Sequence, residues 1–587
     1  MASITDLLSV IVGDAFAAAG LGREFGAVVP SVRPDLSQFQ CNGAFPAARV
    51  ARRNPKQIAA DVAATLAAHD VFQDVSVAGN GFLNLTVTPA YLAARAADIV
   101  GDARVGIAPV DAPLDVVIDF GGPNVAKAMH VGHLRSSIIG DALQRLFAFA
   151  GHRVTSDVHL GDWGTQMGML IVEMSRRAPE LPYFDRAFGG PWPETAPVTL
   201  ADLGEMYPAA AARSKADPVE MEAARAATAE LQAGLPAYRA LWQHFVDVSR
   251  AALEHDFATL GVRFDLWLGE SSVQDRIPAM IDALRASGVA VVSEGMLVIP
   301  VPPAAGGGEV PPLILLKSDG AVMYGTTDLA TVDQRVRDLH ADLILYVVDK
   351  RQALHFHQVF EAARLSGIAG GAALEHIAFG TVNGPDGKPF KTRAGGVLAL
   401  QDLLAMAVDR ATQRIEEAHL AADASPEERA RIAMQVGVGA VRFADLQHER
   451  TTDYVFDLDK FTSFEGYTGP YLQYQAVRCQ SVLRKAAEQG LADGPIVPAH
   501  AAEIELVLQL LQLPDAIRAA VETRAPHHLC SGAYEIAKRF ARFYHACPIL
   551  SDDDAAVRAS RLAVTRLTLR ALDVMLSLLG IEIPERM

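Results

Sequence analysis

The sequence predicts a multidomain protein built around a doubly wound α/β domain with a parallel sheet, of the Rossmann-like kind. The run LDVVIDF (114–120) is almost continuously apolar and rich in β-branched residues, as expected of a strand buried on both faces. A Gly-Pro-rich loop follows, then a helix pattern at 134–151 that ends on Gly151, then a strand pattern at 153–161. This strand–loop–helix–strand order is typical of a βαβ unit with parallel strands.

The chain on either side of this core has different patterns. Residues 1–110 combine an amphipathic helix pattern at the start, a second one at 55–69, and two alternating strands around a Gly-Asn-Gly turn at 75–87. They indicate an N-terminal α+β module. From about residue 400 the strand patterns fade and helical spacing dominates, which indicates a C-terminal all-α bundle; examples are 503–523, 531–544 and 559–579.

These changes of pattern divide the chain into four segments. Within the central segment, a mainly helical pattern at 181–240 indicates part of an insertion. A later buried strand is expected at 344–349, and a hairpin-like loop begins at 376–387, around Asp386-Gly387. We expect an N-terminal module at 1–110, the α/β domain at 111–400 with an insertion at about 181–310, a helical connector at 401–455 and the helical domain at 456–587.

Composition bounds the class of protein. Half of the 587 residues are hydrophobic and 21% are charged, which is typical of a globular chain; the net charge of -17 makes no general case for nucleic-acid binding, although a local basic face remains possible. None of the four cysteines belongs to a C-x-x-C pair, so we expect no zinc site, no metal held by protein side chains and no disulfide framework. Without a basic leader or an apolar run near 18 residues, we expect a cytoplasmic protein outside the membrane.

The turn His130-Val131-Gly132-His133 is the first candidate for chemistry. It follows a buried strand and opens a helix, whose N-terminus offers free N–H groups and a partial positive charge to a phosphate. Gly132 leaves room for a flat ring against the backbone, and the two imidazoles can donate to phosphate oxygens as charge develops. The alternative is that both histidines only cap the helix.

A second candidate is the basic loop Lys388-Pro-Phe-Lys391-Thr-Arg393, which follows a strand and an Asp-Gly turn. A mobile loop with two lysines can close on a triphosphate and neutralise it in the transition state. The alternative is a solvated surface, which is the commoner role of such a run.

Together, the two motifs resemble the paired signature of class I aminoacyl-tRNA ligases, with Pro389, Phe390 and Thr392 as departures from the usual lysine loop. Longer strings resemble one member of that class, the arginyl-tRNA synthetases, across nearly the whole chain and least in 1–110 and 181–235. The strings are IDFGGPNVAKAMHVGHLRSSIIGDAL (118–143), HLGDWGTQMGML (159–170), LLKSDGAVMYGTTDLAT (315–331), YVVDKRQALHFHQVF (346–360), GKPFKTRAGG (387–396), VGAVRFADLQHERTTDYVFD (438–457), SFEGYTGPYLQYQAVR (463–478) and LGIEIPERM (579–587).

The resemblance implies a set of site residues. Asp328 would pair with the guanidinium of arginine beside Tyr324, whereas Asp119 and Asn124 would hold the α-amino end and Gln352 would complete the polar wall. The resemblance also implies ATP as a substrate accompanied by Mg²⁺, and a requirement for tRNA before arginine is activated. The ATP site and catalytic groups would comprise Lys127, His130, Gly132, His133, His355, Lys388 and Lys391. Gly121, Gly122 and Thr327 depart from the family's usual residues without removing any of these groups.

The resemblance implies that the helical end of the chain binds the tRNA anticodon. It also implies that the N-terminal module contacts the tRNA elbow. Basic and aromatic residues interleave in this end, as in proteins that stack unpaired bases. We expect half or more of these aromatics to be core, and Tyr471, Tyr544 and Arg542 are better candidates for the tRNA contact than Phe540. The candidate contacts are Tyr471, Tyr474, Arg478, Arg542 and Tyr544.

Three other functions stay open at this point. Another class I ligase is the first, although Tyr324 and Asp328 favour a cationic substrate. A small-molecule nucleotidyltransferase is the second, but it would not need residues 400–587. A catalytically silent tRNA-binding paralogue is the third, and the intact histidines and lysines argue against it. We expect a monomer that binds tRNA, L-arginine and ATP.

Overall fold

A computed structural model describes residues 3–303, 308–384, 386–388 and 398–587. The chain forms two compact units, which are described separately. One unit contains Met1–Pro109, Arg410–Gln447 and Asp459–Met587; the other contains Val110–Asp409 and His448–Leu458.

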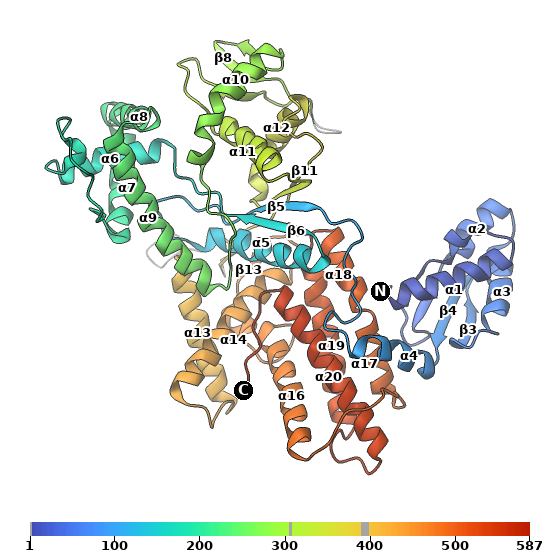
Figure 1. The fold of residues 1–587 in the computed structure, drawn as a ribbon. Helices are drawn as coiled ribbons and strands as arrows, with labels where there is room; N and C mark the ends of the chain where they lie inside the picture. Colours follow the sequence, from blue (N-terminus) through green and yellow to red (C-terminus); the bar gives the residue numbers. More distant parts are fainter. Residues whose placement is uncertain (1–2, 304–307, 385, 389–397) are drawn as a thin grey trace. The chain divides into compact units, whose positions relative to one another are not determined.

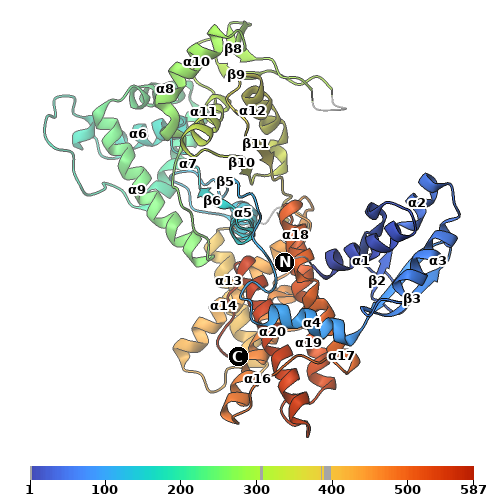
Figure 2. The same ribbon diagram turned by 45° about the vertical axis from the view of Figure 1, so that its right-hand side comes forward.

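The second unit is built on a four-stranded sheet with the order β11-β10-β5-β6, in which every neighbouring pair is parallel. Its strands are β5 (Asp115–Asp119), β6 (Arg153–Asp157), β10 (Leu343–Tyr346) and β11 (Ala373–His376). Helix α5 (Val131–Ala150) joins β5 to β6 on one face, and α12 (Ala353–Leu365) joins β10 to β11 on the other (Figures 1 and 2). The doubly wound parallel sheet predicted from the sequence is thus confirmed.

Helix α5 illustrates how the sequence sets the element bounds. Gly151 adopts a left-handed conformation with a φ of 100°, and its N–H caps the last turn, as expected of a glycine that ends a helix. Leu134, Ile138 and Leu146, four or eight residues apart along the helix, are buried. The polar cap at the other end belongs to the candidate site.

The insertion and the remaining elements of this unit surround the sheet. Three helices follow α6 (Thr165–Arg177), and a small antiparallel sheet, β7-β8-β9, precedes α11 (Tyr324–Asp338). The other elements are η2 (Pro182–Phe184), α7 (Leu200–Ala216), α8 (Pro218–Gln232), α9 (Pro236–Thr259), η3 (Glu270–Arg276), α10 (Ile277–Ala286), β7 (Val291–Ser293), β8 (Met296–Ile299), β9 (Leu313–Leu316), η4 (Lys350–Gln352), β12 (Val382–Asn383) and β13 (Tyr454–Val455).

The first unit joins the N-terminal module to helices from the end of the chain. The module has an antiparallel sheet of order β1-β2-β4-β3. Its elements are α1 (Ile4–Ala18), η1 (Arg23–Gly26), β1 (Val28–Pro30), β2 (Phe39–Cys41), α2 (Ala44–Ala51), α3 (Pro55–Leu66), β3 (Phe72–Ala78), β4 (Phe82–Val87) and α4 (Pro89–Val100). The later helices are α14 (Pro426–Leu446), α16 (Gly469–Glu488), α17 (Ala501–Leu511), α18 (Leu513–Glu522), α19 (His527–Ala546) and α20 (Ala555–Leu578), while α13 (Leu400–Glu417) and α15 (Leu458–Phe461) cross the boundaries between units.

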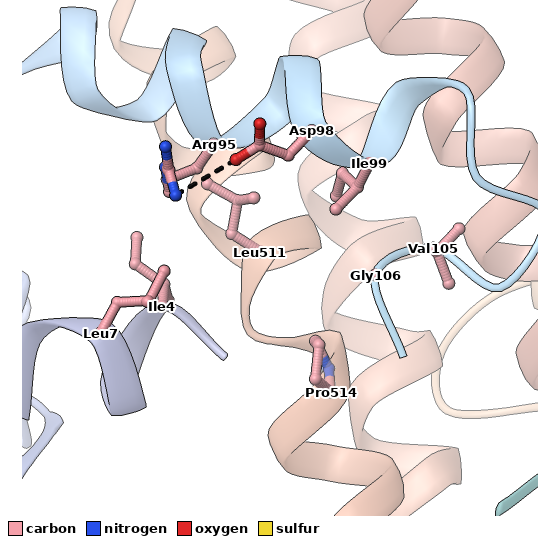
Figure 3. A pocket seen from close by; sticks show the side chains of 9 residues that line it. All are labelled: Ile4, Leu7, Arg95, Asp98, Ile99, Val105, Gly106, Leu511 and Pro514. Carbon is pink, nitrogen blue, oxygen red and sulfur yellow. Dashed lines mark ion pairs between the residues drawn. The ribbon is translucent and has the colours of Figure 1, made fainter. Parts of the chain in front are cut away.

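Contacts within this unit tie α1 and α4 to α17 and α18. Arg518 donates to Asp6 at 2.7 Å, and Thr5 donates to Asp515 at 2.6 Å. Beside these bonds, apolar side chains of Ile4, Leu511 and Pro514 line a small cavity of about 20 Å³ (Figure 3). The module is therefore held by both polar and apolar contacts.

Two expectations about local structure were wrong. The strand at 153–161 ends at Asp157, because His159 has a φ of 44°, which a strand does not allow. The helix expected at 503–523 is two helices that meet at Gln512, where Pro514 lies in the first turn of the second. The hairpin-like loop expected to begin at 376–387 continues into residues outside the described ones; in its described part the Gly384 N–H donates to the Lys388 carbonyl at 2.7 Å around the Asp386-Gly387 turn, and β12 pairs in parallel with β13.

Candidate active site

The sheet order places a crevice between β5 and β10. The chain leaves β5 toward β6 on one side and β10 toward β11 on the other, so the two connecting helices lie on opposite faces at this point. Ligands of doubly wound sheets bind at such a switch point, outside the carboxyl ends of the strands. A cavity of about 260 Å³ lies there, and it is lined by five of the residues predicted from the sequence: Asp119, His130, Gly132, His133 and Gln352.

The two histidines cap helix α5 and contact one another. The Gly132 N–H donates to Nδ1 of His130 at 3.0 Å, and the His130 N–H donates to Nδ1 of His133 at 3.2 Å. Their rings stack with centroids 4.0 Å apart. A Cβ on Gly132 would meet Cε1 of His130 at 2.7 Å, so glycine is needed there for the cap itself.

These cap bonds also fix the protonation pattern of both rings. An Nδ1 that accepts a bond carries no proton, so a neutral imidazole has its proton on Nε2, which then donates. Burial and the nearby charge of Lys127 lower the pKa of His130; burial, His130 and Lys127 lower the pKa of His133 to about 3. Both histidines are therefore neutral donors: each ring accepts its cap bond at Nδ1 and keeps the Nε2–H as a donor.

Helix α11 carries the group predicted to hold the guanidinium. Tyr324 is its first residue and is 60% exposed, and its ring centroid lies 4.6 Å from that of His355. One turn along, the carboxylate of Asp328 bonds to Nε2 of His355. His355, which the sequence predicts to line the ATP site, thus contacts the predicted arginine-binding residues.

The same helix is anchored to the cavity by a buried arginine. Arg335 is 1% exposed and pairs with Asp119 at 2.7 Å and with Asp157 at 2.9 Å. Asp119 and Asp157 end β5 and β6, so one guanidinium joins α11 to the carboxyl ends of two strands. Asp119, which the sequence predicts to hold the α-amino group of arginine, therefore also forms a buried ion pair with Arg335.

The remaining predicted residues that the structure describes lie in loops. Asn124 forms a parallel bridge with Gly161, where any Cβ would meet its Oδ1 at 2.3 Å. The ammonium of Lys127 lies 4.6 Å from the ring centroid of Tyr207 in the insertion. Lys388 is exposed after the Asp386-Gly387 turn, and Lys391 lies outside the described residues.

A further acidic residue near the site, Glu270, was not among the residues predicted from the sequence. It begins η3, which packs against α11, and the pKa of its carboxyl is raised to about 7. The causes are burial first, and then the negative charges of Asp162 and Asp328, opposed by His159. Glu270 is therefore an acidic residue on an element that packs against the helix carrying Asp328.

The helical end of the chain gathers the residues predicted to contact tRNA. The guanidinium of Arg478 lies 4.7 Å from the ring centroid of Tyr474 and 4.9 Å from that of Tyr544. Arg478 also donates to the Tyr474 hydroxyl at 2.9 Å, and Tyr471 lies 5.8 Å from Tyr534. Arg542 is exposed and 3.5 Å from Glu505, whereas Phe540 is fully buried.

Comparison with known proteins agrees with this arrangement. The family model described as "tRNA synthetases class I (R), catalytic domain" matches residues 104–458, and "DALR anticodon binding domain" matches 472–587. The fold and the site are those of a class I aminoacyl-tRNA synthetase. "Arginyl tRNA synthetase N terminal domain" matches 4–87.

Full-length relatives identify the family within this class of synthetases. The chain is 53% identical to the arginine–tRNA ligase of Maricaulis maris and 51% identical to that of Hyphomonas neptunium, with 100% of each chain covered. The solved arginyl-tRNA synthetase of Thermus thermophilus superposes with a TM-score of 0.78 at 25% identity, again over 100% of both chains. This chain belongs to the arginyl-tRNA synthetase family.

Two further findings concern the residues that the structure describes. Among them, no group of three histidine, cysteine, aspartate or glutamate side chains is placed to hold a metal ion. No described helix combines the length and the apolar character needed to cross a membrane.

Proposed function

We propose that the chain is an arginine–tRNA ligase that works in two steps. The carboxylate of L-arginine attacks the α-phosphorus of ATP, which gives arginyl-adenylate and pyrophosphate. A terminal ribose hydroxyl of tRNA(Arg) then attacks the activated carbonyl, which gives arginyl-tRNA and AMP. The observation that carries this proposal is the cavity at the switch point, where neutral histidine donors lie with Asp119, and Asp119 pairs with Arg335 of the helix that bears Tyr324 and Asp328.

The residues act by positioning and by charge stabilisation. Nε2–H of His130 and of His133, with the N-terminus of α5, donates to phosphate oxygens as pyrophosphate leaves. Lys388 and Lys391 neutralise the triphosphate, and Lys127 adds a positive charge beside the cavity. Mg²⁺ bound with ATP would be held mainly by phosphate oxygens.

The amino-acid side of the site selects a cation. Asp328 and Glu270 supply carboxylates to the guanidinium beside the ring of Tyr324. Asp119 and Asn124 would hold the α-amino end, and Gln352, which lines the cavity with Asp119, would complete the polar wall. A pocket built on such hydrogen bonds rejects a substrate that lacks the donors by roughly 10⁴–10⁵-fold, which makes a separate editing step unnecessary.

The helical end of the chain would read the anticodon, with the Arg478 cluster stacking unpaired bases. The protein would act as a monomer in the cytoplasm. Its four cysteines, all free and buried, are compatible with that reducing compartment.

Pyrophosphate exchange tests the activity directly. With arginine, ATP and purified tRNA(Arg) we expect exchange that stops when any one component is omitted. Exchange that does not depend on arginine would refute the assignment. Asp328→Ala should weaken arginine binding, whereas Asp282→Ala on the exposed face of α10 should not; equal affinities in the two variants would refute the proposed pocket.

A further inference from the structure

The loop that leads into the turn at 130–133 is held by the insertion. The Ala126 N–H donates to Oγ of Ser249 in α9 at 2.9 Å, and this serine is 1% exposed. The hydroxyl of Ser249 donates its own proton to the Phe245 carbonyl at 2.7 Å, so its oxygen is left to accept from Ala126. Helix α9 thus fixes the backbone one residue before Lys127.

Ala126 has a backbone conformation that its surroundings must impose. Its φ of 65° lies in the left-handed region, which is costly for a residue with a side chain. Such a conformation persists where the contacts around it leave no alternative. Here these contacts are the bond to Ser249 and an apolar core that Ala126 shares with Leu241 and Phe245 of α9. The insertion therefore determines how the chain leaves Ala126 toward Lys127.

A second helix of the insertion places the side chain of Lys127. The ammonium lies 4.6 Å from the ring centroid of Tyr207 in α7, which is a cation–π distance. Tyr207 packs against the same apolar core that contains Ala126, so its ring is held in position as well. Within the described part of the chain, no carboxylate forms a salt bridge with Lys127. The ammonium is therefore oriented by an aromatic ring, and its charge is left for an anion.

An ammonium held against a ring can still bind a phosphate. It carries three N–H donors, and the face of a single ring does not occupy all of them. A lysine side chain loses rotamer freedom when it binds a ligand, and a ring that restricts it beforehand makes that loss smaller. Lys127 precedes His130, the N-cap of α5, by three residues, so its charge acts close to the N–H groups that begin this helix.

We propose that Tyr207 is a positioning residue for ATP: its ring holds the ammonium of Lys127 in place for the triphosphate, while Ser249 fixes the backbone that carries this lysine. The insertion thereby contributes to ATP binding without touching the nucleotide. The inference rests on the proposed function, in which Lys127 acts on the phosphates. The alternative is that Lys127 only covers the ring of Tyr207, and a double substitution distinguishes the two.

A double-mutant cycle on the full chain, in arginine-dependent pyrophosphate exchange with tRNA(Arg), tests the proposal. Tyr207→Leu should lower kcat/KM for ATP by about three- to tenfold, the size of a cation–π contact, with KM for arginine unchanged. Tyr207→Phe keeps the aromatic face and should stay within about twofold of the wild type. In the Lys127→Met background, Tyr207→Leu should have no further effect. An equal loss in both backgrounds would overturn the proposal, because the ring would then act through packing alone.

A matched substitution elsewhere in the insertion controls for a general loss of packing. Tyr238→Leu is the same change on α9, where the ring lines a different cavity together with Trp192, and it should leave kcat/KM for ATP unchanged. If it lowers kcat/KM as much as Tyr207→Leu does, the effect is not specific to Lys127 and the proposal fails. Where Tyr207→Leu does not fold, Tyr207→Met gives the same comparison, since it keeps a long apolar side chain without a ring.

Ser249→Ala tests the part of the inference that concerns the backbone. It leaves the Ala126 N–H without its acceptor, so the coupling between Tyr207 and Lys127 in the cycle should decrease, and unchanged coupling would overturn the role of Ser249. The inference and the proposed function fail in different ways. Lys127→Met with a wild-type kcat/KM for ATP, in exchange that still requires arginine, would overturn the inference alone, whereas exchange that does not require arginine would refute the proposed function.

Discussion

The N–H of His130 donates to Nδ1 of His133 across 3.2 Å, while Nδ1 of His130 accepts the N–H of Gly132. This reciprocal cap shows that two interpretations of the motif are compatible: the histidines can cap the helix and still donate to a phosphate. The rings cap the helix through one nitrogen and present the other to a ligand, so a variant can separate the two roles.

His130→Asn and His133→Gln should each preserve the cap but remove the Nε2 donor, because asparagine is a good N-cap residue and glutamine suits the third helical position. The rate of arginine-dependent pyrophosphate exchange should fall by about 100-fold or more. The melting temperature should stay close to that of the wild type. Normal exchange in both variants would show that the histidines are caps alone.

The pH dependence of stability follows from His133. Its pKa is lowered to about 3 in the folded chain, against a usual value of 6.5, so only the unfolded state takes up a proton between these values. Stability is therefore complete above about pH 6.5 and falls as the pH decreases toward 3; at pH 5 the loss is about 2 kcal/mol. Urea unfolding of the unit that contains α5 should show a smaller acid loss in His133→Gln, and identical losses would contradict this origin.

The sequence predicted the core of the site because its residues lie near one another along the chain. The turn at 130–133, Asp119 and the helix α5 all belong to one βαβ unit, whose periodicity and glycine cap are local features. Glu270 could not be found in this way. It reaches the site only through bridges between loops about 110 residues apart, Asp157 with Leu266 and Leu160 with Gly269, and no local pattern encodes that pairing.

The same reason explains why Arg335 was not recognised. It lies on a helix that the sequence identified only through family-like strings, and its partners Asp119 and Asp157 come from strands more than a hundred residues earlier. Two other features depend on single positions, which the spacing of apolar residues does not reveal. Pro514 begins a new helix after Gln512, and the left-handed backbone conformation of His159 ends the strand at Asp157.

Arg335→Met should destabilise the α/β unit by about 3–5 kcal/mol, because it leaves two buried carboxylates without their cation. Arg337→Met on the same helix is the matched control. Its guanidinium is 70% exposed beside Asp333, so its loss should cost less than about 1 kcal/mol. Denaturant unfolding compares the two, and equal effects would show that Arg335 does not anchor α11.

The cluster around Arg478 gives a test of tRNA recognition. Its guanidinium lies against Tyr474 and Tyr544, the latter 39% exposed, so it offers charge and flat surfaces together. Arg478→Leu and Tyr544→Leu should each raise KM for tRNA(Arg) by about tenfold or more, since stacking of one base contributes about 1–3 kcal/mol. The kcat should change little, because neither residue lies in the unit that holds the cavity.

Arg484→Leu separates charge from stacking in the same experiment. Arg484 is an exposed residue of α16, the helix that carries Arg478. If phosphate attraction alone drives binding, the two arginine variants should raise KM equally and reduce its salt dependence by the same amount. We expect a larger effect for Arg478 that persists at high salt, because base stacking is not screened by ions.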